Sequence, residues 1–252
     1  MEVEYVVNDE YRQHEEAWRK EHPGGILKFE YHGETFYFYL PFKHDVIQSY
    51  MIYNKTFYEL AQLEELCKYI KTSGIDINTI IDAGANIGNH TIYLTKMLGA
   101  LHTYSFEPFE PAYDTLVDNI CLNKLCFEVS AYNCALGDND MPAKVFYTNS
   151  VHEKDNIGNT KIMQCPEGDM KVSVLDDINI PSKIDFMKID VEGFEARVIL
   201  GAKETILRDK PLIWVESFPE NFVMTNYILE TLGYEIVKEM SEANYIYRCK
   251  NN

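Results

Sequence analysis

This chain has few long apolar runs and little positive charge. No stretch approaches the roughly 18 consecutive apolar residues that a membrane-spanning helix needs, and the N-terminal residues are acidic and polar rather than an apolar leader. Acidic side chains outnumber basic ones by 40 to 23, and the formal charge is −17. A surface of that sign repels nucleic-acid phosphates. We therefore expect a cytoplasmic protein that inserts into no membrane and binds no nucleic acid.

The six cysteines form no C-x-x-C pair and no zinc-finger spacing. Cys121 and Cys126 are the closest neighbours among them, and their spacing is typical of neither a metal knuckle nor a redox pair. Buried, reduced thiols are therefore the expectation, and no metal site is predicted from cysteine.

Glycine is also sparse, with 13 in 252 residues, but two glycines stand in the most informative segment. The run Thr79–Asn89 begins as an apolar strand pattern, enters a turn with Gly84 and Gly88, and continues as a helical pattern. Such a strand, turn and helix start is the usual way in which an α/β sheet receives a nucleoside-containing ligand. Glu107 ends the next apolar run, about 20 residues after Gly88, where doubly wound folds place a carboxylate on ribose hydroxyls.

The turn lacks the third glycine of the dinucleotide fingerprint G-x-G-x-x-G. Asp82 precedes it, and a carboxylate there suits the cationic amino and sulfonium groups of S-adenosylmethionine better than a pyrophosphate. S-adenosylmethionine is therefore the predicted cofactor. Two alternatives stay open: an NAD(P)-dependent oxidoreductase, and a non-catalytic partner protein that uses the same fold.

The hydrophobic pattern divides the chain into an N-terminal segment, 1–74, and a cofactor-binding segment, 75–252. The first is predicted to contain a polar helix over 8–22, a β-hairpin over 26–40 and one helix over 46–70. We expect this N-terminal segment to cover the mouth of the cofactor site, as a lid or as part of the acceptor site.

From residue 75 onward strand and helix patterns alternate, which predicts an α/β fold. Five β-α units and a final antiparallel pair resemble the Rossmann-like, doubly wound, seven-stranded, mostly parallel sheet of methyltransferases, and this resemblance implies the order 3-2-1-4-5-7-6. The third strand is expected over about 127–136, and one helix is expected to run to about Arg208. Residues 149–171 are polar and are predicted to form a long functional loop.

Four stretches together make the chain resemble the FkbM family of S-adenosylmethionine-dependent methyltransferases, from about residue 55 to 217. They are Ile81–Thr91, Phe106-Glu-Pro with the downstream Asn119 and Asn123, Ala135–Asp138, and Lys188-Ile-Asp-Val-Glu-Gly-Phe-Glu195. The first is common to many class I methyltransferases, whereas the last is much more specific to this family. The resemblance implies O-methylation of a hydroxyl on a sugar, glycan precursor or related small metabolite.

The residues predicted to contact the cofactor lie in the glycine turn, at neighbouring strand ends and just before the first core strand: Glu59, Asp82, Gly84, Asn86, Gly88, Asn89, Glu107, Pro108, Ala135, Leu136 and Asp190. Glu107 is expected to bind ribose, with a helix-capping carboxylate as the alternative. Glu59 is expected near the cofactor or on a solvated helix face. By resemblance, Ala135 and Leu136 flank the adenine.

Asp190 and Glu192 follow the fourth strand and are predicted to hold or deprotonate the acceptor hydroxyl, unless both cap the next helix. His152 in the polar loop is a third candidate base, whereas His90 is expected to be structural. With Glu216, the two acids offer oxygen ligands for a divalent cation, but no dedicated spacing demands one. We assign no metal ligand, and a homo-oligomer is compatible with the sequence.

Overall fold

The computed structural model describes residues 9–146, 157, 160–241 and 243–250. In this part of the chain the central sheet has seven strands: β3 (Thr79–Ala83), β4 (His102–Phe106), β5 (Val129–Tyr132), β10 (Phe186–Ile189), β11 (Leu212–Glu216), β12 (Tyr234–Ser241) and β13 (Asn244–Cys249). Their spatial order is β5-β4-β3-β10-β11-β13-β12, and β13 runs antiparallel to β11 and β12. Numbered along the chain, this is the expected order 3-2-1-4-5-7-6. The predicted α/β fold class is confirmed.

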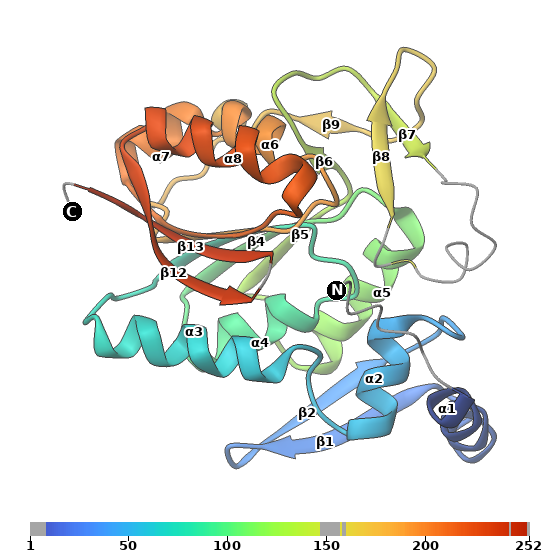
Figure 1. Cartoon of the computed structure of the whole chain (residues 1–252). Coiled ribbons are helices and arrows are strands. Elements are labelled where there is room, and N and C mark those ends of the chain that lie inside the picture. Colours follow the sequence, from blue (N-terminus) through green and yellow to red (C-terminus); the bar gives the residue numbers. More distant parts are fainter. Residues whose placement is uncertain (1–8, 147–156, 158–159, 242, 251–252) are drawn as a thin grey trace.

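Helices cover both faces of the sheet (Figure 1). One face carries α3 (Leu60–Thr72), α4 (Asn89–Leu98) and α5 (Glu110–Leu122), and the other carries α6 (Glu195–Gly201), α7 (Lys203–Asp209) and α8 (Pro219–Thr231). Every residue of β3 and β10 is buried, because a parallel strand covered on both sides has no face left for water. The strand order reverses between β3 and β10, so their carboxyl ends mark the place where such sheets bind ligands.

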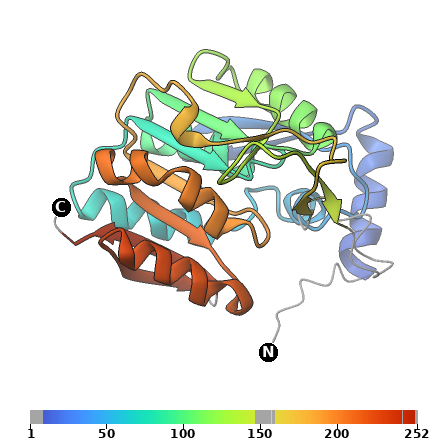
Figure 2. The same cartoon turned by 90° about the horizontal axis from the view of Figure 1, so that it is seen from above.

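The N-terminal segment contains α1 (Asp9–Glu21), the hairpin of β1 (Ile26–Tyr31) and β2 (Glu34–Tyr39), and α2 (Val46–Asn54). The hairpin lies beyond α4 and α5, on the side of these helices away from the sheet (Figure 1). Both views place α1 far from the end of β13 (Figures 1 and 2). The hairpin therefore packs on the helix layer, and the connection after α2 is the part that reaches the strand ends.

Two amide side chains of α5 attach the hairpin. Asn119 accepts a hydrogen bond from the Tyr39 N–H at 2.6 Å, and Asn123 accepts one from the Tyr37 N–H at 3.2 Å and donates to the Tyr37 carbonyl at 2.6 Å. Four helical residues advance about 6 Å, nearly the same as two strand residues, so the two spacings match. The asparagines thus satisfy backbone groups along the outer edge of β2, as a neighbouring strand would.

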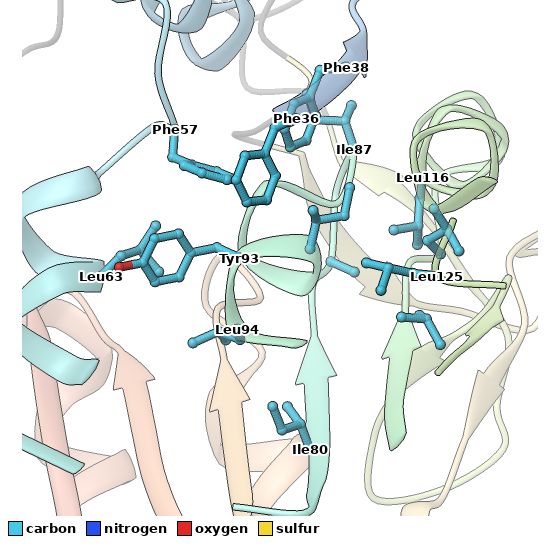
Figure 3. Packing of buried hydrophobic residues seen from close by; sticks show 14 of the residues in the cluster. Phe36, Phe38, Phe57, Leu63, Ile80, Ile87, Tyr93, Leu94, Leu116 and Leu125 are labelled. Carbon is cyan, nitrogen blue, oxygen red and sulfur yellow. The ribbon is translucent and has the colours of Figure 1, made fainter. Parts of the chain in front are cut away.

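A cluster of aromatic rings fills the space between the hairpin and the sheet helices (Figure 3). Phe57 packs edge-on against Phe36 and Tyr93, with ring centroids 4.8 and 5.0 Å apart, and both phenylalanines are fully buried. Such edge-to-face pairs add to the free energy of simple burial. Tyr93 belongs to α4, so the N-terminal segment and the cofactor-binding segment share one hydrophobic core.

The single helix expected over 46–70 is two helices. Lys55 ends α2 in the left-handed conformation, with φ of 51°, and donates its N–H to the Met51 carbonyl. Glu59 is also left-handed, with φ of 55°, at the start of α3. Two left-handed residues cannot continue a right-handed helix, and the apolar spacing conceals this break.

The third strand is shorter than expected, because the chain leaves the central sheet after Tyr132. The short strand β6 (Ala135–Leu136) pairs instead with β9 (Val172–Ser173). The loop prediction for 149–171 is wrong for β8 (Lys161–Gln164), which pairs antiparallel with β7 (Ala143–Phe146). Residues 149–156, 158 and 159 of that loop lie outside the described residues.

The helix expected to reach Arg208 is divided into α6 and α7. A side chain at Gly201 would overlap the Gly137 carbonyl, so a glycine permits this close packing at the end of α6. Asp176, in the short 3-10 turn η2 (Leu175–Asp177), accepts hydrogen bonds from the N–H groups of Glu204 and Thr205. This carboxylate caps the start of α7 and so defines a second helix.

The expectation of buried thiols holds for Cys67, Cys134 and Cys249 but is wrong for Cys121 and Cys126, which are exposed. These two lie at the solvent-facing end of α5 and the turn after it. Among the helices of the described residues, none combines the length and apolar character required to cross a membrane.

Candidate active site

The glycine turn after β3 packs directly against the end of β10. Gly84 has φ of 81°, and a Cβ atom at this position would overlap the carbonyl oxygen of Asp190. The Asp190 N–H donates to the Ala83 carbonyl at 3.1 Å. Asn86 and Gly88 also have positive φ, of 49° and 90°, and Gly88 begins α4. The sequence needs glycine at 84 because two central backbones meet there.

Glu107 connects this turn to the start of α5. One carboxylate oxygen accepts the Asn86 N–H and the other accepts the Phe109 N–H, each at 2.8 Å. Burial raises the pKa of Glu107 to about 7, although the two N–H groups lower it. Phe109 is the cap residue of α5, so the helix-capping alternative describes part of what Glu107 does. A carboxylate has about four acceptor positions, which leaves room for ribose hydroxyls.

Asp82 does not face the open end of the turn. Its side chain is fully buried, accepts a hydrogen bond from Thr91 Oγ1 at 2.5 Å and lies 3.8 Å from the ammonium of Lys188. In the structure its carboxylate binds protein groups, and its predicted contact with the cofactor stays a prediction. Thr91 of α4 and Lys188 of β10 enclose the carboxylate of Asp82. Its charge therefore lies beneath the turn.

Lys188 also lies 2.9 Å from Asp190. Burial alone would raise the pKa of Asp190, but the charge and hydrogen bond of Lys188 lower it overall. Burial and the charges of Asp190 and Glu59 raise the pKa of Glu216 well above its usual range. Of these two carboxyl groups, Glu216 is therefore the one that favours the protonated form, and Asp190 favours the ionised form. A carboxylate held ionised by a lysine is a weak base, so Asp190 is suited to orienting a cation or a hydroxyl.

Glu192 is the acid in this turn whose ionisation falls near neutral pH. It is half-buried, and its backbone is left-handed with φ of 53°. Burial and then the charge of Asp190 raise its pKa to about 8, against a smaller opposing effect of Lys161 from β8. A carboxyl group with such a pKa is matched to proton transfer at physiological pH.

Glu195 belongs to the same turn and was absent from the predicted site. It is buried, and one carboxylate oxygen accepts the Gly193 N–H at 2.6 Å. Its other oxygen has no hydrogen-bond partner within the described residues. The second acid of the Glu-Gly-x-Glu string was the signal in the sequence that pointed to this position.

The connection between α2 and α3 enters the site through two contacts with α4. The side chain of Asn89 accepts the Tyr58 N–H at 2.9 Å and donates to the Tyr58 carbonyl at 3.1 Å. Both ends of this amide bind protein backbone, and the predicted place of Asn89 at the cofactor stays a prediction. His90 Nε2 lies 3.2 Å from Glu59, and its ring packs edge-on against Trp214. Glu59 therefore lies in the site and not on a solvated helix face.

The other predicted residues take less central positions. Pro108 is half-buried beside Glu107, and Ala135 and Leu136 are buried in β6. His152 lies outside the described residues, so its role stays a prediction. Within the part of the chain that the structure describes, no group of three His, Cys, Asp or Glu side chains is arranged to hold a metal ion.

Comparison with known proteins identifies the family. The profile of the methyltransferase FkbM domain matches residues 82–247, which contain the glycine turn, Glu107 and the Lys188–Glu195 string. The chain belongs to the FkbM methyltransferase family. This membership agrees with the resemblance drawn from the motifs and argues against an NAD(P)-dependent oxidoreductase.

Similar proteins include two methyltransferases. Methyltransferase 1 of Beauveria bassiana is 28% identical over 187 residues, which cover 65% of this chain and 75% of that protein. Methyltransferase sdnD of Sordaria araneosa is 24% identical over 196 residues, covering 65% and 76%. The crystal structure of methyltransferase FkbM from Methylobacillus flagellatus is 20% identical, with a TM-score of 0.49, over 69% of this chain and 44% of that one.

Proposed function

We propose that this FkbM-family methyltransferase uses S-adenosylmethionine to methylate a hydroxyl of a sugar, glycan precursor or related small metabolite. The observation that carries the proposal is the excess of carboxyl groups over basic groups at the ends of β3 and β10. Asp82, Asp190 and Glu192 lie there, and Lys188 is the buried cation between two of them. A site with this balance attracts a ligand that bears positive charge.

The donor atoms around the glycine turn fit the cationic end of S-adenosylmethionine. Asn86 Oδ1 is a buried acceptor that has no donor within the described residues. An unpaired buried acceptor costs free energy unless a ligand supplies a donor, and an ammonium group supplies three. A pyrophosphate would instead place negative charge beside Asp82 and Asp190, which is unfavourable.

We assign the roles in this site as follows. Glu107 binds the ribose hydroxyls, the backbone at Asn86 and Gly88 contacts the methionine end, and Asp190 orients the amino group or the acceptor hydroxyl. Glu192 accepts the hydroxyl proton, because its pKa of about 8 lies near neutral pH. When bound, S-adenosylmethionine supplies the electrophilic methyl group.

The acceptor site is assigned to the N-terminal segment and the 149–171 region. Asp45 supports this assignment because it connects the two: one oxygen accepts the Gln48 N–H at the start of α2, and the other accepts the Ile157 N–H at 3.1 Å. Segments outside the shared core commonly determine which substrate is bound. The partner implied by this assignment is a small-molecule or glycan acceptor.

Calorimetric titration with S-adenosylhomocysteine tests the cofactor assignment. We expect one site per chain, and Glu107→Ala should weaken binding by roughly 1–3 kcal/mol, the scale of a lost hydrogen bond to a charged group. Glu110→Ala is the matched control, since Glu110 is exposed in the first turn of α5. If the wild-type protein bound NAD and not S-adenosylhomocysteine, the cofactor assignment would be wrong.

The acceptor chemistry needs a separate experiment. The protein is incubated with S-adenosylmethionine labelled in the methyl group and a panel of saccharides, amines and carboxylic acids. We expect label in products that survive base, as methyl ethers do. Label found only in base-labile esters or on nitrogen would overturn O-methylation of a hydroxyl while leaving the cofactor assignment intact. Binding without any transfer would support the non-catalytic alternative.

A further inference from the structure

The turn after α5 brings two exposed cysteines together. Lys124 is left-handed, with φ of 59°, and donates its N–H to the Cys121 carbonyl at 3.0 Å. The next N–H, of Leu125, donates to the Ile120 carbonyl at 3.0 Å. This pair of bonds with a left-handed residue is the Schellman motif, which reverses the chain over the last helical turn. Cys126, the residue that follows, therefore returns beside Cys121.

Contacts of the preceding residue, Leu125, hold the backbone of the turn that contains Cys126. Leu125 is buried in the hydrophobic core, and its carbonyl accepts the N–H groups of Glu128 and Val129. The Sγ atoms of Cys121 and Cys126 lie 3.1 Å apart, close enough for a thiol hydrogen bond. A disulfide bond is about 2.05 Å long, so closing one requires the sulfurs to approach by about 1 Å.

The Cys121 thiol is less ready to form a thiolate than an ordinary cysteine. The hydrogen bond with Cys126, together with partial burial, raises the pKa of the Cys121 thiol. A thiol with a raised pKa forms less thiolate, so Cys121 is suited to attack second, as the thiol that resolves a mixed disulfide. Both side chains are exposed, unlike the buried Cys67, Cys134 and Cys249.

We propose that Cys121 and Cys126 form a reversible redox modification site that closes to an intramolecular disulfide by exchange with a low-molecular-weight disulfide. The Cys126 thiolate attacks one sulfur of the small disulfide, which releases one thiol and leaves a mixed disulfide. Cys121 then loses its proton and attacks the Cys126 sulfur, which releases the second thiol. Two protein thiols are oxidised by two electrons, and one small disulfide is reduced to two thiols.

The closed ring would enclose Asn123, the residue whose amide binds the backbone of Tyr37 in the hairpin. Oxidation therefore acts at the point where α5 holds the N-terminal segment. The site lies outside the carboxylate cluster at the strand ends, so this inference does not depend on the proposed methyl transfer.

The experiment treats the full-length protein with oxidised glutathione and maps the cysteines by mass spectrometry under non-reducing conditions. We expect a peptide pair joined by a Cys121–Cys126 disulfide, which disappears on treatment with dithiothreitol. Cys121→Ser should trap a glutathione adduct on Cys126, because the resolving thiol is missing. Cys165→Ser is the control and should leave the disulfide unchanged, since Cys165 lies elsewhere on the chain.

Three results would overturn the proposal. They are glutathione adducts that persist on both cysteines of the wild-type protein, thiols that stay free under conditions that modify Cys165, and a disulfide that joins Cys121 or Cys126 to another chain.

Discussion

Lys188 lies 2.9 Å from the carboxylate of Asp190, with 2% of its side chain exposed. Lys188 lies in β10, and Asp190 directly follows the last residue of this strand. One residue separates them, so their side chains point to the same face of the sheet. In the neighbouring strand Lys188 is in register with Asp82, whose carboxylate lies 3.8 Å away. One ammonium thus serves two carboxylates on adjacent strands and determines the charge of the site.

Replacing Lys188 with methionine should destabilise the protein strongly. Asp82 and Asp190 would remain buried without their cation, and removing one partner of a buried pair typically costs about 3–5 kcal/mol. Chemical denaturation measures the loss. Lys183→Met is the matched control, because Lys183 forms an exposed pair with Asp185 at 3.5 Å, and such pairs contribute about 0–1 kcal/mol. Equal losses in the two variants would show that the buried pair has no special role.

Gly84→Ala should disrupt the site, because the new methyl group would overlap the Asp190 carbonyl. Gly33 provides a matched control, since it has the same φ of 81° but nothing within 4 Å of an added Cβ. Gly33→Ala should cost only the roughly 1–2 kcal/mol of left-handed backbone. Gly84→Ala should cost clearly more and abolish binding of S-adenosylhomocysteine. Thermal unfolding and calorimetry compare them, and similar behaviour of the two variants would contradict the overlap.

Asn119 and Asn123 should differ in their effect on the cofactor site. Both bind the hairpin, but Asn119 also donates to the carbonyl of Ile87 in the glycine turn at 2.8 Å. Each change to alanine should lower the free energy of unfolding by about 1–3 kcal/mol, the cost of unsatisfied buried groups. Only Asn119→Ala should also weaken S-adenosylhomocysteine binding measured by calorimetry. Weakening of the same size in Asn123→Ala would show that the hairpin as a whole supports the turn.

The stability of the ligand-free protein should fall as pH rises from about 4.5 to about 8. The pKa values of Glu107 and Glu192 are raised in the folded state to about 7 and about 8, so the folded protein retains protons that the unfolded chain releases near 4.5. This contribution is complete below pH 4.5 and is lost as pH rises through the folded-state values. The pKa of Asp190 is lowered in the folded state, so its contribution to stability has the opposite sign. It is present above the usual pKa of an aspartate and is lost as the pH falls below that value.

Urea denaturation at pH 5, 6.5 and 8.5 measures this dependence. Glu192→Gln should flatten the decline above pH 6.5, because glutamine does not titrate. A decline as steep as that of the wild type would assign the titration to other groups.

Much of the architecture was predictable because it depends on short-range patterns. The alternation of apolar strands and amphipathic helices identified the α/β class and the order of the sheet. Gly84 and Gly88 located the turn, since a left-handed backbone favours glycine within a few residues of its own sequence. Glu107 was found in the same way, as an acid at the end of a buried strand.

The errors fall where apolar spacing carries no information about backbone conformation, strand pairing or exposure. The spacing around 46–70 contained the apolar period of a helix but not the left-handed backbone at Lys55 and Glu59. Periodicity also could not show that β8 pairs with β7, or that Cys121 and Cys126 remain exposed while they touch each other.

The sequence by itself determined the fold class, the glycine turn and the family, because periodicity, turn chemistry and motif strings are local properties. Only the tertiary structure decided the charge state of the site. Asp82 is enclosed by Thr91 and Lys188, and Asp190 is held ionised by the same lysine. Glu107 and Glu192 have pKa values raised to about 7 and about 8, so both titrate near neutral pH. A pKa depends on burial and on charges a few ångströms away, and folding alone brings those charges together.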